Sequence, residues 1–125
     1  MMLLQPQEVE VYYLLPAIRR ELSLALKASG KAQHEIAKLL GVTDAAVSQY
    51  VSKKRGNDAA FPAPLSAFVR DAALRITDHA SMVREAQAIL ARARDTKLIC
   101  QIHERVSDDI PRGCSVCFEQ KEGRI

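Results

Sequence analysis

Residues 33–50 read QHEIAKLLGVTDAAVSQY, a short helical pattern, a Gly-Val-Thr break and a second short helical pattern. The apolar positions that share one side of the first pattern are Ile36, Leu39 and Leu40. Gly41 follows them, where a left-handed backbone is easy for glycine, and Thr43 is a good N-cap for the next helix. The stretch therefore predicts two short helices, over about 33–40 and 44–54, that meet at a tight corner.

The second of these helices has an apolar side and a polar side. Val47 and Tyr50 continue the apolar side. The positions left pointing outward are Asp44, Ala45, Ser48, Gln49 and Ser52. A face that only packs against another helix would be apolar, whereas this one is small and polar. Two helices at a steep corner with a polar second helix are suited to a DNA groove, and a glutamine amide such as that of Gln49 can pair with adenine.

Positive charge gathers around the same stretch. Residues 31–55 hold five Lys or Arg and two acidic residues, a net charge of +3, which equals the formal charge of the whole chain. Lys53, Lys54 and Arg55 follow the second helix, where contacts with DNA phosphates are expected. The residues predicted to contact DNA are Gln33, Thr43, Asp44, Ala45, Ser48, Gln49, Ser52, Lys53, Lys54 and Arg55.

The stretch resembles the helix-turn-helix of the lambda-repressor-like (XRE-type) transcription regulators. The resemblance is carried by Gln33, Ile36-Ala37, Leu40-Gly41-Val42-Thr43, Ala46-Val47-Ser48-Gln49-Tyr50, Ser52 and Lys53-Lys54-Arg55-Gly56. It covers residues 15–56, less than half of the chain. One departure is Ala32, where the family usually has the Ser or Thr that caps the first helix. The resemblance implies a sequence-specific DNA-binding regulator of transcription.

The rest of the chain also has helical patterns, and no strand alternation is evident. Further helices are expected from residue 7, with a start or kink at Pro16, to about Ser29, and over 65–76, 80–94 and 95–106. We therefore expect an all-α fold, with a lambda-repressor-like DNA-binding domain at 1–56 and a helical dimerisation segment with a cofactor-binding tail at 57–125.

The apolar stripe between Met82 and Ala93 has two interpretations, because it can pack on the chain's own helices or pair with a second copy. One helix-turn-helix buries too little DNA surface for specific binding at physiological salt. We therefore expect a homodimer, built largely from residues 62–106.

All three cysteines lie near the C-terminus, and His103 is close to the first of them. The candidate metal ligands are Cys100, His103, Cys114 and Cys117. Their pattern is C-x2-H followed by C-x2-C, which can bring two pairs of ligands to one centre, as a tetrahedral zinc or an iron–sulfur cluster requires. Regulators resembling this one end in paired cysteines, often with a cysteine at the position of His103. We favour an iron–sulfur cluster that senses redox state or iron. Structural zinc stays open as the alternative, as do cysteines without a metal.

Other classes of protein fit less well. A thiol-redox enzyme using Cys114 and Cys117 would need a βαβ context that is absent, and no catalytic triad or phosphate-binding glycine loop is evident, so we expect no enzymatic activity. An antitoxin-like repressor, whose residues 57–125 bind a partner protein, remains an alternative. No run of about eighteen apolar residues exists. Glu8 and Glu10 interrupt the N-terminal apolar stretch, unlike a signal peptide. We expect a cytoplasmic protein that does not enter membranes.

Overall fold

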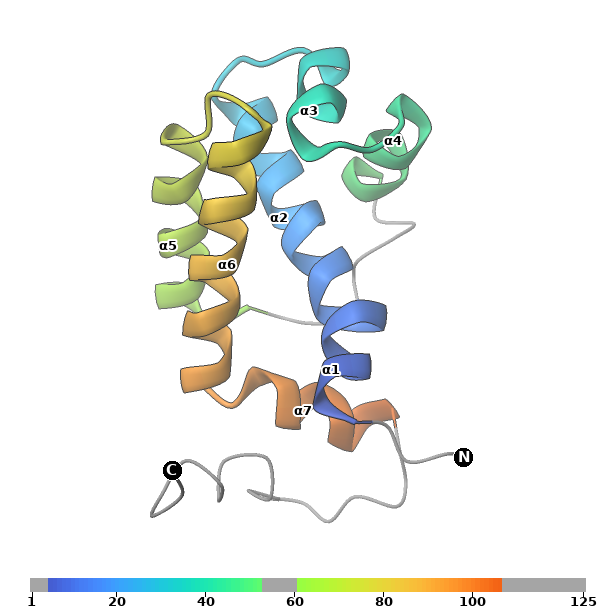
Figure 1. Cartoon of the computed structure of the whole chain (residues 1–125), viewed down its shortest axis with the longest axis vertical. Helices are drawn as coiled ribbons and strands as arrows, with labels where there is room; N and C mark the ends of the chain where they lie inside the picture. The colour runs from blue at the N-terminus through green and yellow to red at the C-terminus, as the bar shows by residue number, and fades with distance from the viewer. Residues whose placement is uncertain (1–4, 53–60, 107–125) are drawn as a thin grey trace.

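The computed structural model of the chain describes residues 5–52 and 61–106, and these residues are helical with no strand among them. The elements are α1 (Pro6–Val9), the π-helical segment η1 (Glu10–Leu14), α2 (Leu15–Ala28), α3 (Gln33–Leu40), α4 (Asp44–Val51), α5 (Ala63–Leu74), α6 (His79–Asp95) and α7 (Leu98–Val106). The predicted all-α class is confirmed. Figure 1 shows α2, α5 and α6 running alongside one another, with α3 and α4 at one end and α7 at the other.

The first three elements form one continuous helix that contains a wide turn just before Pro16. A proline inside a helix has no N–H to donate, and its ring crowds the carbonyl group four residues earlier. Here the Leu15 N–H donates to the carbonyl of Glu10, five residues back, which is the π-helical pattern. The irregularity predicted at Pro16 is therefore a π-helical segment that lets the helix pass through the proline.

The apolar stripe of α2 is the centre of the hydrophobic core. Ile18, Leu22 and Leu26 are at most 1% exposed, and α2 packs against α3, α4, α5 and α6. The buried cluster is continuous from Val9 in α1 to Ile102 in α7. Helices on both sides of residue 56, where the sequence predicts a functional division, thus contribute to the same core.

The stripe on α6 faces mainly into this core. Met82, Ile89, Leu90 and Ala93 are all less than 9% exposed, whereas Val83 is 45% exposed. Packing within the chain, the first of the two interpretations above, therefore accounts for most of the stripe. The homodimer remains a prediction, and the large apolar side chains that α5 and α6 leave exposed within the described ranges are Leu74 and Val83.

An ion pair joins the last turn of α6 to the first helix of the chain. The Arg94 guanidinium donates to both carboxylate oxygens of Glu10, with Nε–Oε2 at 2.7 Å and Nη2–Oε1 at 3.1 Å. This hydrogen bonding to Glu10 raises the pKa of Arg94 above its ordinary value. The Glu10 side chain is only 11% exposed, so its carboxylate needs a partner within the protein. Arg94, 84 residues away in the sequence, supplies that partner.

The last described helix closes the lower end of the core. Leu98 and Ile102 of α7 are buried, and α7 packs against α1, η1 and α6. No helix within residues 5–52 and 61–106 has both the length and the apolar character needed to cross a membrane.

Candidate nucleic-acid interface

The corner between α3 and α4 is built from local backbone hydrogen bonds. Gly41 adopts a left-handed conformation, with φ 70° and ψ 34°. The Val42 N–H donates to the carbonyl of Ala37 at 3.0 Å, and the Gly41 N–H donates to that of Lys38 at 3.3 Å. This pair of bonds is the Schellman arrangement, which satisfies carbonyl groups at the end of a helix. The predicted helix end at Gly41 is therefore confirmed.

Thr43 starts α4 as the sequence predicts. Its Oγ1 accepts a hydrogen bond from the Ala46 N–H at 3.1 Å, and its own backbone is extended. Asp44 follows in the first turn, where a negative charge suits the positive end of the helix dipole. Helix α4 ends at Val51, three residues before the end predicted from the sequence.

The start of α3 is held differently, because Ala32 has no side chain that can cap it. Instead the Glu35 carboxylate accepts the Ala32 N–H at 3.3 Å. The Gln33 side-chain amide donates to the backbone carbonyl of Asp44 at 3.0 Å, and so connects the starts of the two helices. Gln33, predicted as a DNA contact, thus also holds the corner together. The nearby pair of His34 and Asp44, at 3.6 Å, is well exposed and contributes little to stability.

The buried and exposed sides of α4 follow the prediction. Ala46, Val47 and Tyr50 are at most 8% exposed. The predicted contact residues that the structure describes are all exposed, namely Gln33, Thr43, Asp44, Ala45, Ser48, Gln49 and Ser52. Figure 1 shows α4 at the edge of the molecule, on the side of α3 away from α5 and α6. The outward side of α4 is therefore accessible to a large partner.

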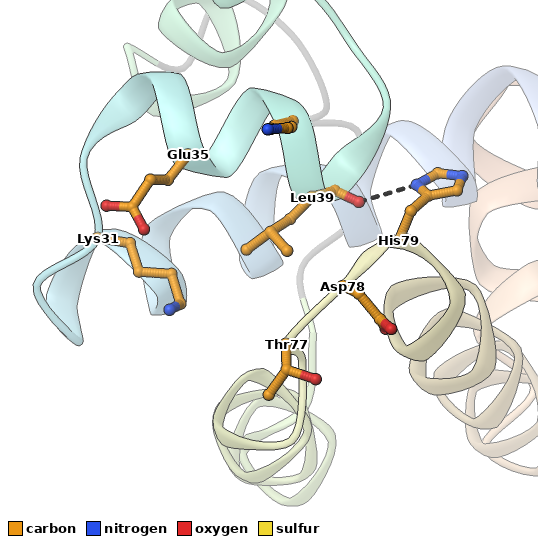
Figure 2. A pocket seen from close by; sticks show the side chains of 7 residues that line it. Lys31, Glu35, Leu39, Thr77, Asp78 and His79 are labelled. Carbon is orange, nitrogen blue, oxygen red and sulfur yellow. Dashed lines mark hydrogen bonds between the residues drawn. The ribbon is translucent and has the colours of Figure 1, made fainter.

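A contact that the sequence did not predict supports the corner from behind. The Nδ1 atom of His79, the first residue of α6, lies 2.9 Å from the carbonyl oxygen of Leu39 (Figure 2). A carbonyl only accepts, so Nδ1 carries the proton in this contact. A Cβ atom on Gly41 would lie 2.7 Å from Cε1 of the same ring. His79 thus caps the end of α3 and packs on the glycine of the turn. The sequence Thr77-Asp78-His79 indicates a helix boundary. It does not indicate Leu39 as the partner of His79, because the two residues are 40 positions apart.

The predicted basic stretch Lys53, Lys54 and Arg55 lies outside the described residues, as do Cys114 and Cys117. Cys100 lies on α7 and is 6% exposed, and His103 follows it by three residues on the same helix. Within the described ranges, no three His, Cys, Asp or Glu side chains come close enough together to hold a metal ion. Because Cys114 and Cys117 lie outside the described residues, the predicted metal site stays a prediction from the sequence.

Comparisons with protein-family models, curated proteins and solved structures find no match to this chain. The resemblance to the XRE-type regulators rests on the residues quoted above and stays a prediction from the sequence.

Proposed function

We propose that this protein is a sequence-specific DNA-binding regulator of transcription that inserts α4 into the major groove. The observation that carries the proposal is the outward side of α4, where Ala45, Ser48, Gln49 and Ser52 are exposed on a helix whose other side is buried. Small and uncharged polar side chains let a helix approach base edges closely, and an amide can form two hydrogen bonds to adenine.

Two features support this role beyond the outward side of α4. The first is that the α3–α4 corner is held by its own hydrogen bonds, namely the Schellman bonds, the Thr43 cap and the bond from the Gln33 amide. The basic stretch at 53–55 follows closely after α4, and phosphate contacts supply much of the affinity of DNA-binding proteins. A pair of chains reading two half-sites about 34 Å apart would supply the surface that a single motif lacks. The active species is therefore proposed to be a homodimer.

Gln49→Ala is expected to cost about 1–3 kcal/mol of binding free energy at the preferred site and to relax one base position. The reason is the loss of a two-bond contact with one base. The measurement starts with selection of double-stranded DNA by the wild-type chain from a random library at fixed salt. The same selection is then repeated with the variant.

Gln7→Ala is the matched control, since Gln7 is an exposed glutamine on α1, at the end of the molecule away from α4. It should leave both sequence preference and affinity unchanged. Failure of the wild-type chain to enrich any DNA sequence would refute the proposed function. If wild type and Gln49→Ala enrich the same sequence, Gln49 does not contact a base. The proposed DNA-binding function would still stand.

The cysteine-bearing end is proposed to hold an iron–sulfur cluster, with zinc as the alternative. Three thiolates and an imidazole suit either group, and they come from Cys100, His103, Cys114 and Cys117. The first two are three residues apart within α7, as the sequence pattern requires. Because α7 packs on α1, η1 and α6, ordering of this end would act on the same core that supports α3 and α4. The cluster would supply sensitivity to oxidation or to iron.

Cys114→Ser is expected to abolish the bound metal and to change DNA affinity by a factor that corresponds to a coupling of about 1–3 kcal/mol. Metal analysis and visible absorption of protein purified without oxygen measure the first effect, and DNA titration measures the second. Ser115→Ala, one residue along, should retain both properties. Wild-type protein that holds no metal, either after anaerobic purification or with added zinc, would end the cofactor hypothesis. A variant that loses metal but binds DNA normally would indicate a structural site.

A further inference from the structure

A cavity of about 430 Å³ separates α3 from the connection between α5 and α6. Its walls are Lys31, Glu35, Lys38, Leu39, Thr77, Asp78 and His79 (Figure 2). The volume lies within the range of about 300–1,000 Å³ that small-molecule sites occupy. Figure 2 shows the Leu39 side chain and the Lys31 ammonium extending from the α3 side toward the segment that carries Thr77. The cavity is distinct from the outward side of α4.

Both carboxylates in the cavity wall are already used at helix ends. Glu35 accepts the N–H of Ala32 at 3.3 Å, and Asp78 accepts the N–H of Ser81 at 2.8 Å. The hydrogen bonds from Ser81 hold the pKa of Asp78 below its ordinary value. Each of these two carboxylates therefore has a backbone partner at the start of a helix.

The two lysines of the cavity wall differ from the carboxylates, because neither has an ion-pair partner in the described part of the chain. The ion pairs found within residues 5–52 and 61–106 include Arg20–Glu21, Arg75–Glu85 and Arg94–Glu10, and none of them contains Lys31 or Lys38. The Thr77 hydroxyl on the facing wall can donate a further hydrogen bond. The cavity wall therefore offers two ammonium groups that have no ion-pair partner among the described residues, beside the apolar surface of Leu39.

We propose that this cavity binds a small organic anion, whose carboxylate or phosphate oxygens contact Lys31 and Lys38 and whose apolar part lies on Leu39. Ammonium groups bind such oxygens through charge-assisted hydrogen bonds, which are stronger than neutral ones. The site touches α3 on one wall and the first residue of α6 on the other. A bound ligand would therefore contact both sides of the His79–Leu39 hydrogen bond that supports the corner.

The test uses the full chain without DNA, with inorganic phosphate and citrate as probes, chloride at matched ionic strength and glycerol as the uncharged control. Isothermal titration should give saturable binding of at least one anion and none of glycerol. Lys31→Ala/Lys38→Ala should weaken that binding about tenfold or more, since each lysine contributes a hydrogen bond to a charged group. The matched control is Lys27→Ala/Arg70→Ala, which removes the same charge from exposed positions outside the cavity and should stay within about twofold of wild type.

Phosphate and citrate also stabilise proteins in general, so the rise in melting temperature is compared among the three proteins. A rise that saturates in wild type and in the control, but not in the cavity variant, supports the site. Equal binding by both double variants, or no saturable binding of either anion, overturns it. DNA binding that weakens in the cavity variant while neither free anion binds would assign the lysines to DNA phosphates and would also overturn it. Because these titrations contain no DNA, the outcome does not depend on the proposed function.

Discussion

Gly41→Ala is expected to lower the free energy of unfolding by about 2–3 kcal/mol. A non-glycine residue pays a backbone cost in the left-handed region, where Gly41 has φ 70°. The new Cβ would also lie 2.7 Å from Cε1 of His79, so the ring must move and its hydrogen bond to Leu39 is strained or lost. Chemical denaturation followed by circular dichroism measures the change.

A double-mutant cycle separates these two causes. In Gly41→Ala/His79→Ala the clash is absent, so the combined cost should be smaller than the sum of the two single costs by about 1 kcal/mol or more. Gly30 offers the control, because it also has a positive φ, of 99°, but an added Cβ would meet nothing within 4 Å. Gly30→Ala and His79→Ala should therefore be additive. Additivity of Gly41→Ala with His79→Ala would show that the ring does not pack on the turn.

Arg94→Met is expected to destabilise the fold by about 2–4 kcal/mol, since it leaves the largely buried Glu10 carboxylate without its cation. The lower end of this range is favoured because the guanidinium is itself 48% exposed, and water can partly replace it. Denaturant unfolding at pH 7 measures the loss.

Two further variants make this result specific to the ion pair. Glu10→Leu/Arg94→Met removes both charges and should recover much of the lost stability, because a buried pair often contributes little net stability compared with apolar residues. Arg70→Met removes an exposed arginine of α5 and should change stability by no more than about 0.5 kcal/mol. If Arg94→Met and Arg70→Met cost the same, Glu10 does not depend on Arg94.

The corner from Gln33 to Val51 was predictable because its signals are local. Helical spacing identifies Ile36 and Val47 as buried, and a glycine and a threonine mark where one helix ends and the next begins. These signals act over three or four residues, so no knowledge of the rest of the chain is needed. The same locality explains why α4 was predicted too long, since the spacing beyond Val51 contains no stop signal until Gly56.

Pairings between distant segments could not be predicted in this way. The stripe on α6 is equally apolar whether it packs inward or against a second copy, and only the position of α2 and α5 beside it shows that most of it faces the core. Nothing near Glu10 in the sequence points to Arg94, and nothing near His79 points to Leu39. A charge or a ring takes the partner that the folded backbone brings within hydrogen-bonding distance. The spacing of residues in the sequence therefore determines the helices and their buried sides. The Glu10–Arg94 ion pair, the His79–Leu39 hydrogen bond and the cavity beside it form only when the helices have packed.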